Sequence, residues 1–151
     1  MEAIYKINIV VVFMSMLLHG TQISARPNSD ENIAAMKKAL IDTCMAKYPL
    51  TPDIIDSAKK GLMPDDRNFK CFLMCNFDEM SLIDSETADI DVDTMVSLIP
   101  DEDMKAVIKK AADHCLPNIA GKPDTCEVSY NFAVCALKVD EKIMKIFSCG
   151  N

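Results

Sequence analysis

Cysteine is the residue type whose number and spacing in this sequence are most informative about chemistry. The 151-residue chain has seven cysteines. Thiols at regular intervals form either disulfides or metal sites, and the redox compartment decides between the two. The N-terminal segment indicates the compartment, because a signal peptide directs a chain to an oxidising one. Six of the cysteines follow one order of intervals: Cys44, 26 residues, Cys71, 3 residues, Cys75, 39 residues, Cys115, 10 residues, Cys126, 8 residues and Cys135.

The N-terminal segment has the pattern of a secretory signal peptide. Residues 9–18 form a largely apolar run of ten residues, which is too short to span a bilayer. The small residue Ala25 favours cleavage after it, with Gly20 as a rival position. A retained signal anchor is the alternative, and the shortness of the run disfavours it. We therefore predict a signal peptide at 1–25, a single mature domain at 26–151, and a secreted, extracellular protein.

The chain is acidic, which bears on its partners. It carries 16 Lys and Arg against 23 Asp and Glu, a formal net charge of −7 at pH 7, and its basic residues do not cluster along the sequence. An acidic protein repels phosphate backbones and anionic lipid surfaces. We therefore expect no nucleic-acid partner and no stable insertion into a membrane.

Hydrophobic residues recur at helical spacing along most of the chain, and no Asn-Gly or Asp-Gly hairpin separates alternating runs. The pattern predicts an all-α fold of about six short helices, with boundaries set by proline, glycine and acidic residues. The expected helices span about 28–48, 52–60, 67–80, 92–98, 104–116 and 125–139.

The cysteines occupy defined faces of these helices. In the first helix Cys44 shares a face with Met36 and Leu40, so it is expected to point inward. The third helix is apolar on more than one face and is expected to be central. Its two cysteines are one turn apart, while the two in the sixth helix point about 180 degrees apart. Six cysteines allow 15 pairings, and the residues alone do not choose among them.

The six-cysteine order, behind a signal peptide and with about six short helices, resembles that of insect odorant-binding proteins, the pheromone and general odorant carriers. The resemblance covers the whole predicted mature chain. Its most specific elements are the 3-residue and 8-residue intervals. The interlocked pairing of that family implies three disulfides: Cys44–Cys75, Cys71–Cys126 and Cys115–Cys135.

The resemblance implies a function in olfaction and chemosensory transport. Such a protein reversibly binds small hydrophobic ligands, odorants or pheromones, and delivers them through sensillar fluid to receptors. The same fold also serves as a salivary, venom, reproductive or hormone and lipid carrier, and the sequence does not separate these roles. Expected partners are a small hydrophobic molecule and an olfactory receptor. The oligomeric state, monomer or homodimer, is left open.

Cross-linked helices are expected to enclose a hydrophobic cavity. Flexible Met and aromatic side chains suit ligands of varied shape, although apolar positions at helical spacing equally suit ordinary core. The predicted ligand-binding residues are Phe72, Leu73, Met80, Leu82, Met95, Leu98, Val107, Ile108, Ala111, Phe132, Ala133 and Ala136. The apolar tail adds Ile146 and Phe147, as part of a lid within 136–151 or of a docked terminus.

Two residues leave alternatives open. Cys149 lies outside the six-cysteine order, so a free thiol, an intermolecular bridge and an alternative internal pairing are all open, and its place near the end favours an exposed thiol. His114 is the one histidine after the predicted signal peptide, and it suits either a pH-dependent switch or a cation at a helix C-terminus.

The sequence lacks the common catalytic motifs. It has four glycines, no Gly-x-Ser-x-Gly elbow and no glycine-rich phosphate loop. With one histidine after the predicted signal peptide, a metal site on cysteine and histidine is also disfavoured in an oxidising compartment. We therefore expect no enzyme activity, no catalytic residues, no metal and no cofactor.

Overall fold

The structure is a computed structural model, and it describes residues 29–119 and 124–144. The predicted signal peptide, Ile146, Phe147 and Cys149 lie outside the described residues. The chain divides into two compact units, Met1–Asn32 and Ile33–Asn151. Only the start of one helix is described in the first unit, so the account below concerns the second.

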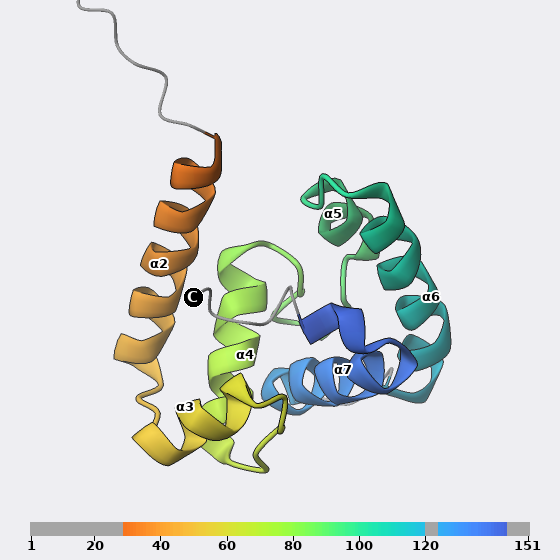
Figure 1. The fold of residues 1–151 in the computed structure, drawn as a ribbon. Helices are drawn as coiled ribbons and strands as arrows, with labels where there is room; N and C mark the ends of the chain where they lie inside the picture. Colours follow the sequence, from red (N-terminus) through yellow and green to blue (C-terminus); the bar gives the residue numbers. More distant parts are fainter. Residues whose placement is uncertain (1–28, 120–123, 145–151) are drawn as a thin grey trace, which may run out of the picture. The chain divides into compact units, whose positions relative to one another are not determined.

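The described residues confirm the all-α prediction, with helices close to the expected spans (Figure 1). No helix among them is long and apolar enough to cross a membrane. Their one extended pairing is an isolated bridge between Ile83 and Ile90. The elements are α2 (Ser29–Lys47), α3 (Pro52–Lys59), α4 (Arg67–Glu79), α5 (Val92–Ser97), α6 (Glu102–Ile119), α7 (Thr125–Val139) and a 3-10 turn, η1 (Glu141–Ile143).

Aspartate side chains start four of these α-helices. Asp66, Asp91, Asp101 and Asp124 precede α4, α5, α6 and α7, and each accepts a hydrogen bond from a backbone N–H of the first turn. These N–H groups have no partner within the helix, so the carboxylates satisfy them. Thr51 before α3 makes no such side-chain bond. There Pro52 supplies a backbone conformation suited to the first helical position.

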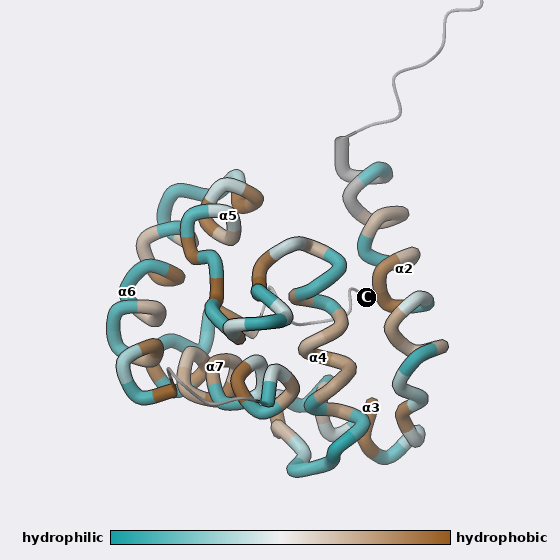
Figure 2. Tube along the Cα trace, turned by 180° about the vertical axis from the view of Figure 1, so that it is seen from behind, coloured by the Kyte–Doolittle hydropathy of each residue, from teal (hydrophilic) through white to brown (hydrophobic). Residues whose placement is uncertain are grey.

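Helix α4 is central, as expected. It packs along α7, and α7 in turn packs along α6, so that α7 reaches from one to the other (Figure 1). Both Phe69 and Phe77, near opposite ends of α4, are buried. The hydrophilic residues of α6 alternate with hydrophobic ones along the helix (Figure 2). This alternation fits a helix with one face on the core and one in water.

The cysteines are joined in the pairs that the resemblance implies. Cys44–Cys75 links α2 to α4, with 5.7 Å between Cα atoms. Cys71–Cys126 links α4 to α7 at 4.5 Å, and Cys115–Cys135 links α6 to α7 at 5.9 Å. The bridges close sequence separations of 31, 55 and 20 residues. Four helices are thereby joined in the order α2, α4, α7, α6.

Two expectations about helix faces and ends are wrong. Met36 is 72% exposed, because α2 contacts the core of the described chain only from Leu40 onwards. Helix α6 does not stop at Leu116 but continues through Pro117 to the buried Ile119. The Asn118 side chain donates a hydrogen bond to the His114 carbonyl, at 3.0 Å, within this last turn. His114 therefore lies before the helix end rather than at it.

Candidate ligand-binding site

One apolar cluster brings together most of the predicted ligand-binding residues. It lies among α5, α6, α7, η1 and the segment after α4. Met80 and Val107 pack against it and remain partly accessible. Most of the side chains are aliphatic or aromatic, so the cluster can hold an apolar molecule by burial and dispersion. Its buried members from the predicted set are Leu82, Met95, Ile108, Ala111, Phe132 and Ala136.

The remaining predicted residues that the structure describes do not join this cluster. Phe72 packs with the Cys44–Cys75 disulfide in a second cluster. Leu73 and Ala133 pack with Phe69 in a third, between α4 and α7. The single lining that the sequence suggests is therefore divided among three clusters. The reason is that α4 and α7 are buried on more than one face, so neighbouring residues point to different sides.

Leu98 also departs from the prediction. It is 57% exposed, whereas Met95, three residues earlier, is buried. Helix α5 ends at Ser97, so Leu98 is the residue that caps it and does not continue the buried face.

Several core residues are missing from the predicted set. Phe77 and Phe132 meet edge to face, with ring centroids 6.2 Å apart. Ile143 in η1 is fully buried in the same cluster. The apolar third helix and the apolar tail were the signals for these two. By contrast, Ile83 lies in an acidic segment without helical periodicity, where the sequence gives no signal for burial.

One polar side chain is buried in the described part of the chain. Ser129 on α7 is 0% exposed, and its hydroxyl has no hydrogen-bond partner among the described residues. It lies one helical turn before Phe132 and Ala133, between the first and third clusters.

Charged residues hold the outer edge of the α4–α7 contact. Lys70 pairs with Asp65 and, at 2.9 Å, with Glu127, and its ammonium lies 4.8 Å from the centre of the Tyr130 ring. The hydrogen bonds to Asp65 and then Glu127 raise the pKa of Lys70. Tyr130 donates a hydrogen bond to the Met63 carbonyl at 3.0 Å, and burial raises its pKa. These contacts fix the flank of the helix pair.

The end of the same helix contact carries a second ion pair. Arg67 on α4 lies 2.6 Å from Asp124, the residue that caps α7. The hydrogen bond from Arg67 is the largest cause that lowers the pKa of Asp124, and backbone N–H groups of α7 add to it. One carboxylate thus both starts α7 and connects it to α4.

Two surface hollows lie beside α7, and neither is lined by the predicted ligand-binding residues. The first, about 660 Å³, lies next to the Cys71–Cys126 disulfide and contains the Arg67–Asp124 pair. The second, about 910 Å³, lies between α6 and α7. No group of three or more His, Cys, Asp or Glu side chains in the described ranges could hold a metal ion.

The family of the chain follows from a sequence match that covers the helices described above. A family model described as the PBP/GOBP family matches residues 27–139. The chain belongs to this family. The odorant-binding resemblance that the cysteine order suggests is thereby confirmed, and the matched segment spans all six described α-helices but not η1.

Curated relatives agree with the PBP/GOBP assignment. General odorant-binding protein 69a of Drosophila melanogaster is 28% identical over 135 residues, covering 87% of this chain and 88% of the relative. General odorant-binding protein 72 of Anopheles gambiae is 23% identical over 121 residues, covering 77% and 97%.

Solved structures share the fold. Odorant binding protein 7 from Anopheles gambiae, with four disulfide bridges and in complex with an azo compound, has a TM-score of 0.69 at 24% identity, covering 81% of this chain and 97% of that one. The fatty acid binding protein OBP56a from the oral disk of the blowfly Phormia regina has a TM-score of 0.57 at 18% identity, covering 76% and 96%. The all-α architecture is therefore that of insect odorant-binding proteins.

Proposed function

We propose that this protein is a secreted carrier that reversibly binds small hydrophobic molecules, such as odorants or pheromones. Its PBP/GOBP membership supports a binding role. The similar Anopheles gambiae structure is named as a complex with an azo compound, and the blowfly one as a fatty acid binding protein. Both names refer to small, largely apolar molecules, the class that an apolar interior favours.

The observation that carries this proposal is the apolar cluster among α5, α6, α7 and η1. It is built from residues such as Ile108 and Phe132, with Ser129 as the one buried polar side chain of the described chain. A ligand there would be held by shape and apolar contact rather than by charge. Such contacts are easily made and lost, which suits transport and release.

We further propose that residues 1–25 are a cleaved signal peptide and that 26–151 form one domain, secreted into sensillar fluid for delivery to an olfactory receptor. The alternative is the same fold acting as a carrier outside olfaction, in a gland or a mouthpart. Localisation by antibody distinguishes them: staining of antennal sensilla supports olfactory delivery, while staining confined to gland or gut supports the alternative.

A fluorescent-probe displacement assay tests the binding proposal. The chain has no Trp, so an external apolar probe is required. We expect Met80→Ala and Val107→Ala each to weaken ligand binding by roughly threefold to tenfold, because each removes apolar contact worth about 1 kcal/mol. Leu98→Ala is the matched control, since Leu98 is exposed. Equal effects of all three substitutions, or no displacement of probe by any apolar ligand, would contradict the proposal.

A further inference from the structure

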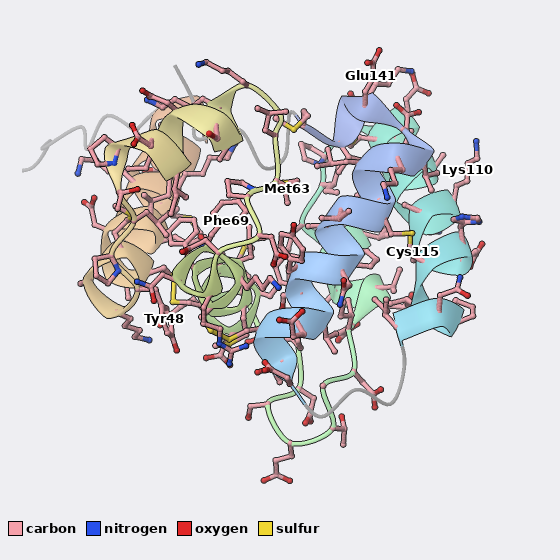
Figure 3. All side chains as sticks on the ribbon, turned by 90° about the horizontal axis from the view of Figure 1, so that it is seen from below. Tyr48, Met63, Phe69, Lys110, Cys115 and Glu141 are labelled. Carbon is pink, nitrogen blue, oxygen red and sulfur yellow. A yellow bond between two sulfur atoms is a disulfide. The ribbon has the colours of Figure 1, made fainter. Side chains whose placement is uncertain are left out.

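The hollow between α6 and α7 combines space with positive charge. Its volume is about 910 Å³, which lies within the range of small-ligand sites. In Figure 3 the Lys110 side chain extends outward from α6, while the disulfide of Cys115 lies between the two helices. The lining comprises Ala106, Lys109, Lys110, Asp113, His114, Cys135, Lys138 and Val139.

Lysines outnumber carboxylates in the lining of this hollow. Lys109, Lys110 and Lys138 form no ion pair with any described residue, and Asp113 is the one acid in the lining. Lys105, on the same helix, is by contrast paired with Glu102 at 2.6 Å. Three lysines against one aspartate give the lining a positive balance of charge, on a protein whose formal net charge is −7.

The other hollow differs in this respect. Its cation, Arg67, is paired with Asp124, which also lines it, so the charges there compensate each other. An excess of positive over negative side chains thus distinguishes the α6–α7 hollow from the α4–α7 one.

The wall between the lysines is apolar and fixed. Ala106 from α6 and Val139 from α7 contribute small apolar side chains, and Cys135 places the disulfide beside them. The Cys115–Cys135 bridge holds the Cα atoms of these two residues 5.9 Å apart and so joins α6 to α7, and lysines from both helices line the one hollow. A site that is already formed loses little entropy on binding.

We propose that this hollow binds an amphiphilic organic anion, with its carboxylate among Lys109, Lys110 and Lys138 and its short alkyl chain on Ala106 and Val139. Ammonium groups on separate helices can approach a carboxylate from different directions. The apolar wall favours a molecule with a tail over a bare inorganic anion. The site lies on the outer side of the interior cluster, against which Cys135 and Val139 also pack, and the inference does not rest on the proposed function.

A backbone NMR titration with octanoate tests the site. The protein is first saturated with 1-octanol, a neutral molecule with the same chain length, so that interior sites are occupied. Octanoate is then expected to shift the amide signals of 106–114 and 135–139, while further 1-octanol leaves them unchanged. The Lys109→Gln, Lys110→Gln, Lys138→Gln triple variant should bind octanoate roughly tenfold more weakly, because exposed ion pairs contribute modestly and add up.

A second triple variant separates this site from the overall charge. Lys37→Gln, Lys59→Gln and Lys60→Gln together remove the same charge from exposed lysines of α2 and the α3 end. This control should keep the affinity of the unmodified protein. Equal weakening in both triple variants would reduce the effect to net charge and overturn the proposal. Equal shifts produced by inorganic phosphate would also overturn it, because the apolar tail would then contribute nothing.

Discussion

Ser129 is the residue whose position is hardest to explain by packing alone. Its hydroxyl is fully buried among apolar side chains without a partner in the described part of the chain. An unsatisfied buried hydroxyl costs about 1–3 kcal/mol. A small residue at this position still has a structural use, because α4 and α7 approach to 4.5 Å between Cα atoms one turn earlier, at the Cys71–Cys126 bridge.

Ser129→Ala is therefore expected to raise the free energy of unfolding by about 1 kcal/mol, since the substitution removes an unpaired polar group and keeps the small size. Urea unfolding followed by circular dichroism measures it. Ser97→Ala is the control, because the exposed Ser97 hydroxyl donates to the Thr94 carbonyl at 2.7 Å and its loss should change little. A clear loss of stability in Ser129→Ala would mean that its hydroxyl is hydrogen-bonded.

Asp124 links stability to pH. Its pKa is lowered in the folded protein, first by the hydrogen bond from Arg67. A lowered carboxyl pKa contributes stability above the unfolded pKa of about 3.9, and this contribution is lost as pH falls through the folded pKa. Asp124→Asn keeps a capping side chain but removes the charge, so its stability should fall less steeply below about pH 4 than that of the unmodified protein.

Thermal unfolding between pH 6 and pH 2 checks this difference. Asp53→Asn is the matched control, because Asp53 is an exposed first-turn carboxylate with no ion pair to the described residues. Identical pH profiles for Asp124→Asn and Asp53→Asn would show that the Arg67 pair does not contribute.

At the scale of elements, α4 and α7 each hold two disulfides, whereas α2 and α6 hold one each. Helix α2 is attached through Cys44–Cys75, the small cluster around it, and the Lys47–Glu79 ion pair at 2.7 Å. Its residues before Leu40 contribute no buried side chain among those described. This helix is therefore the element most dependent on a single bridge.

Replacing Cys44 and Cys75 together by serine is expected to lower the free energy of unfolding by about 3 kcal/mol, the value typical for a disulfide closing a loop of this length. Hydrogen exchange should rise most in α2 and least in the α4–α7 pair, which keeps its own bridge. The matched variant replaces Cys115 and Cys135 by serine, and its exchange should instead rise in α6. The same exchange pattern in both variants would contradict this division.

The sequence predicts helix starts better than helix surroundings. Proline and aspartate act locally, so the starts of α4, α5 and α7 follow from residues beside them. The end of α6 does not, because the buried Ile119 extends the helix beyond Pro117. Met36 has the correct periodicity for a buried face, yet burial needs a partner that only tertiary structure provides.

The candidate sites show the same limit. Periodicity identifies Phe132 and Ala133 as apolar, but not that they face different clusters. The sequence does not predict the α6–α7 hollow, because Lys109 and Lys138 are far apart along the chain and its basic residues do not cluster. Only the packing of α6 on α7, fixed by Cys115–Cys135, brings those lysines to one concavity.

For the whole molecule, the segment after α7 contributes to the core. Ile143 in η1 is fully buried and packs in the cluster with α6 and α7. A chain that ends after Val139 therefore loses part of its core. A chain that ends after Met144 keeps that core and lacks only 145–151, the segment that contains the proposed lid residues Ile146 and Phe147.

The two truncations separate core from lid. The chain ending after Val139 should lose about 2–4 kcal/mol of stability, comparable with removing a buried isoleucine side chain. The chain ending after Met144 should unfold near the unmodified protein but release an apolar probe faster, because nothing of 145–151 remains to cover the interior. Urea unfolding and stopped-flow probe release measure the two effects. If the chain ending after Met144 kept both the ligand affinity and the release rate of the unmodified protein, Ile146 and Phe147 would have no lid function. The segment after α7 would then act only through the burial of Ile143.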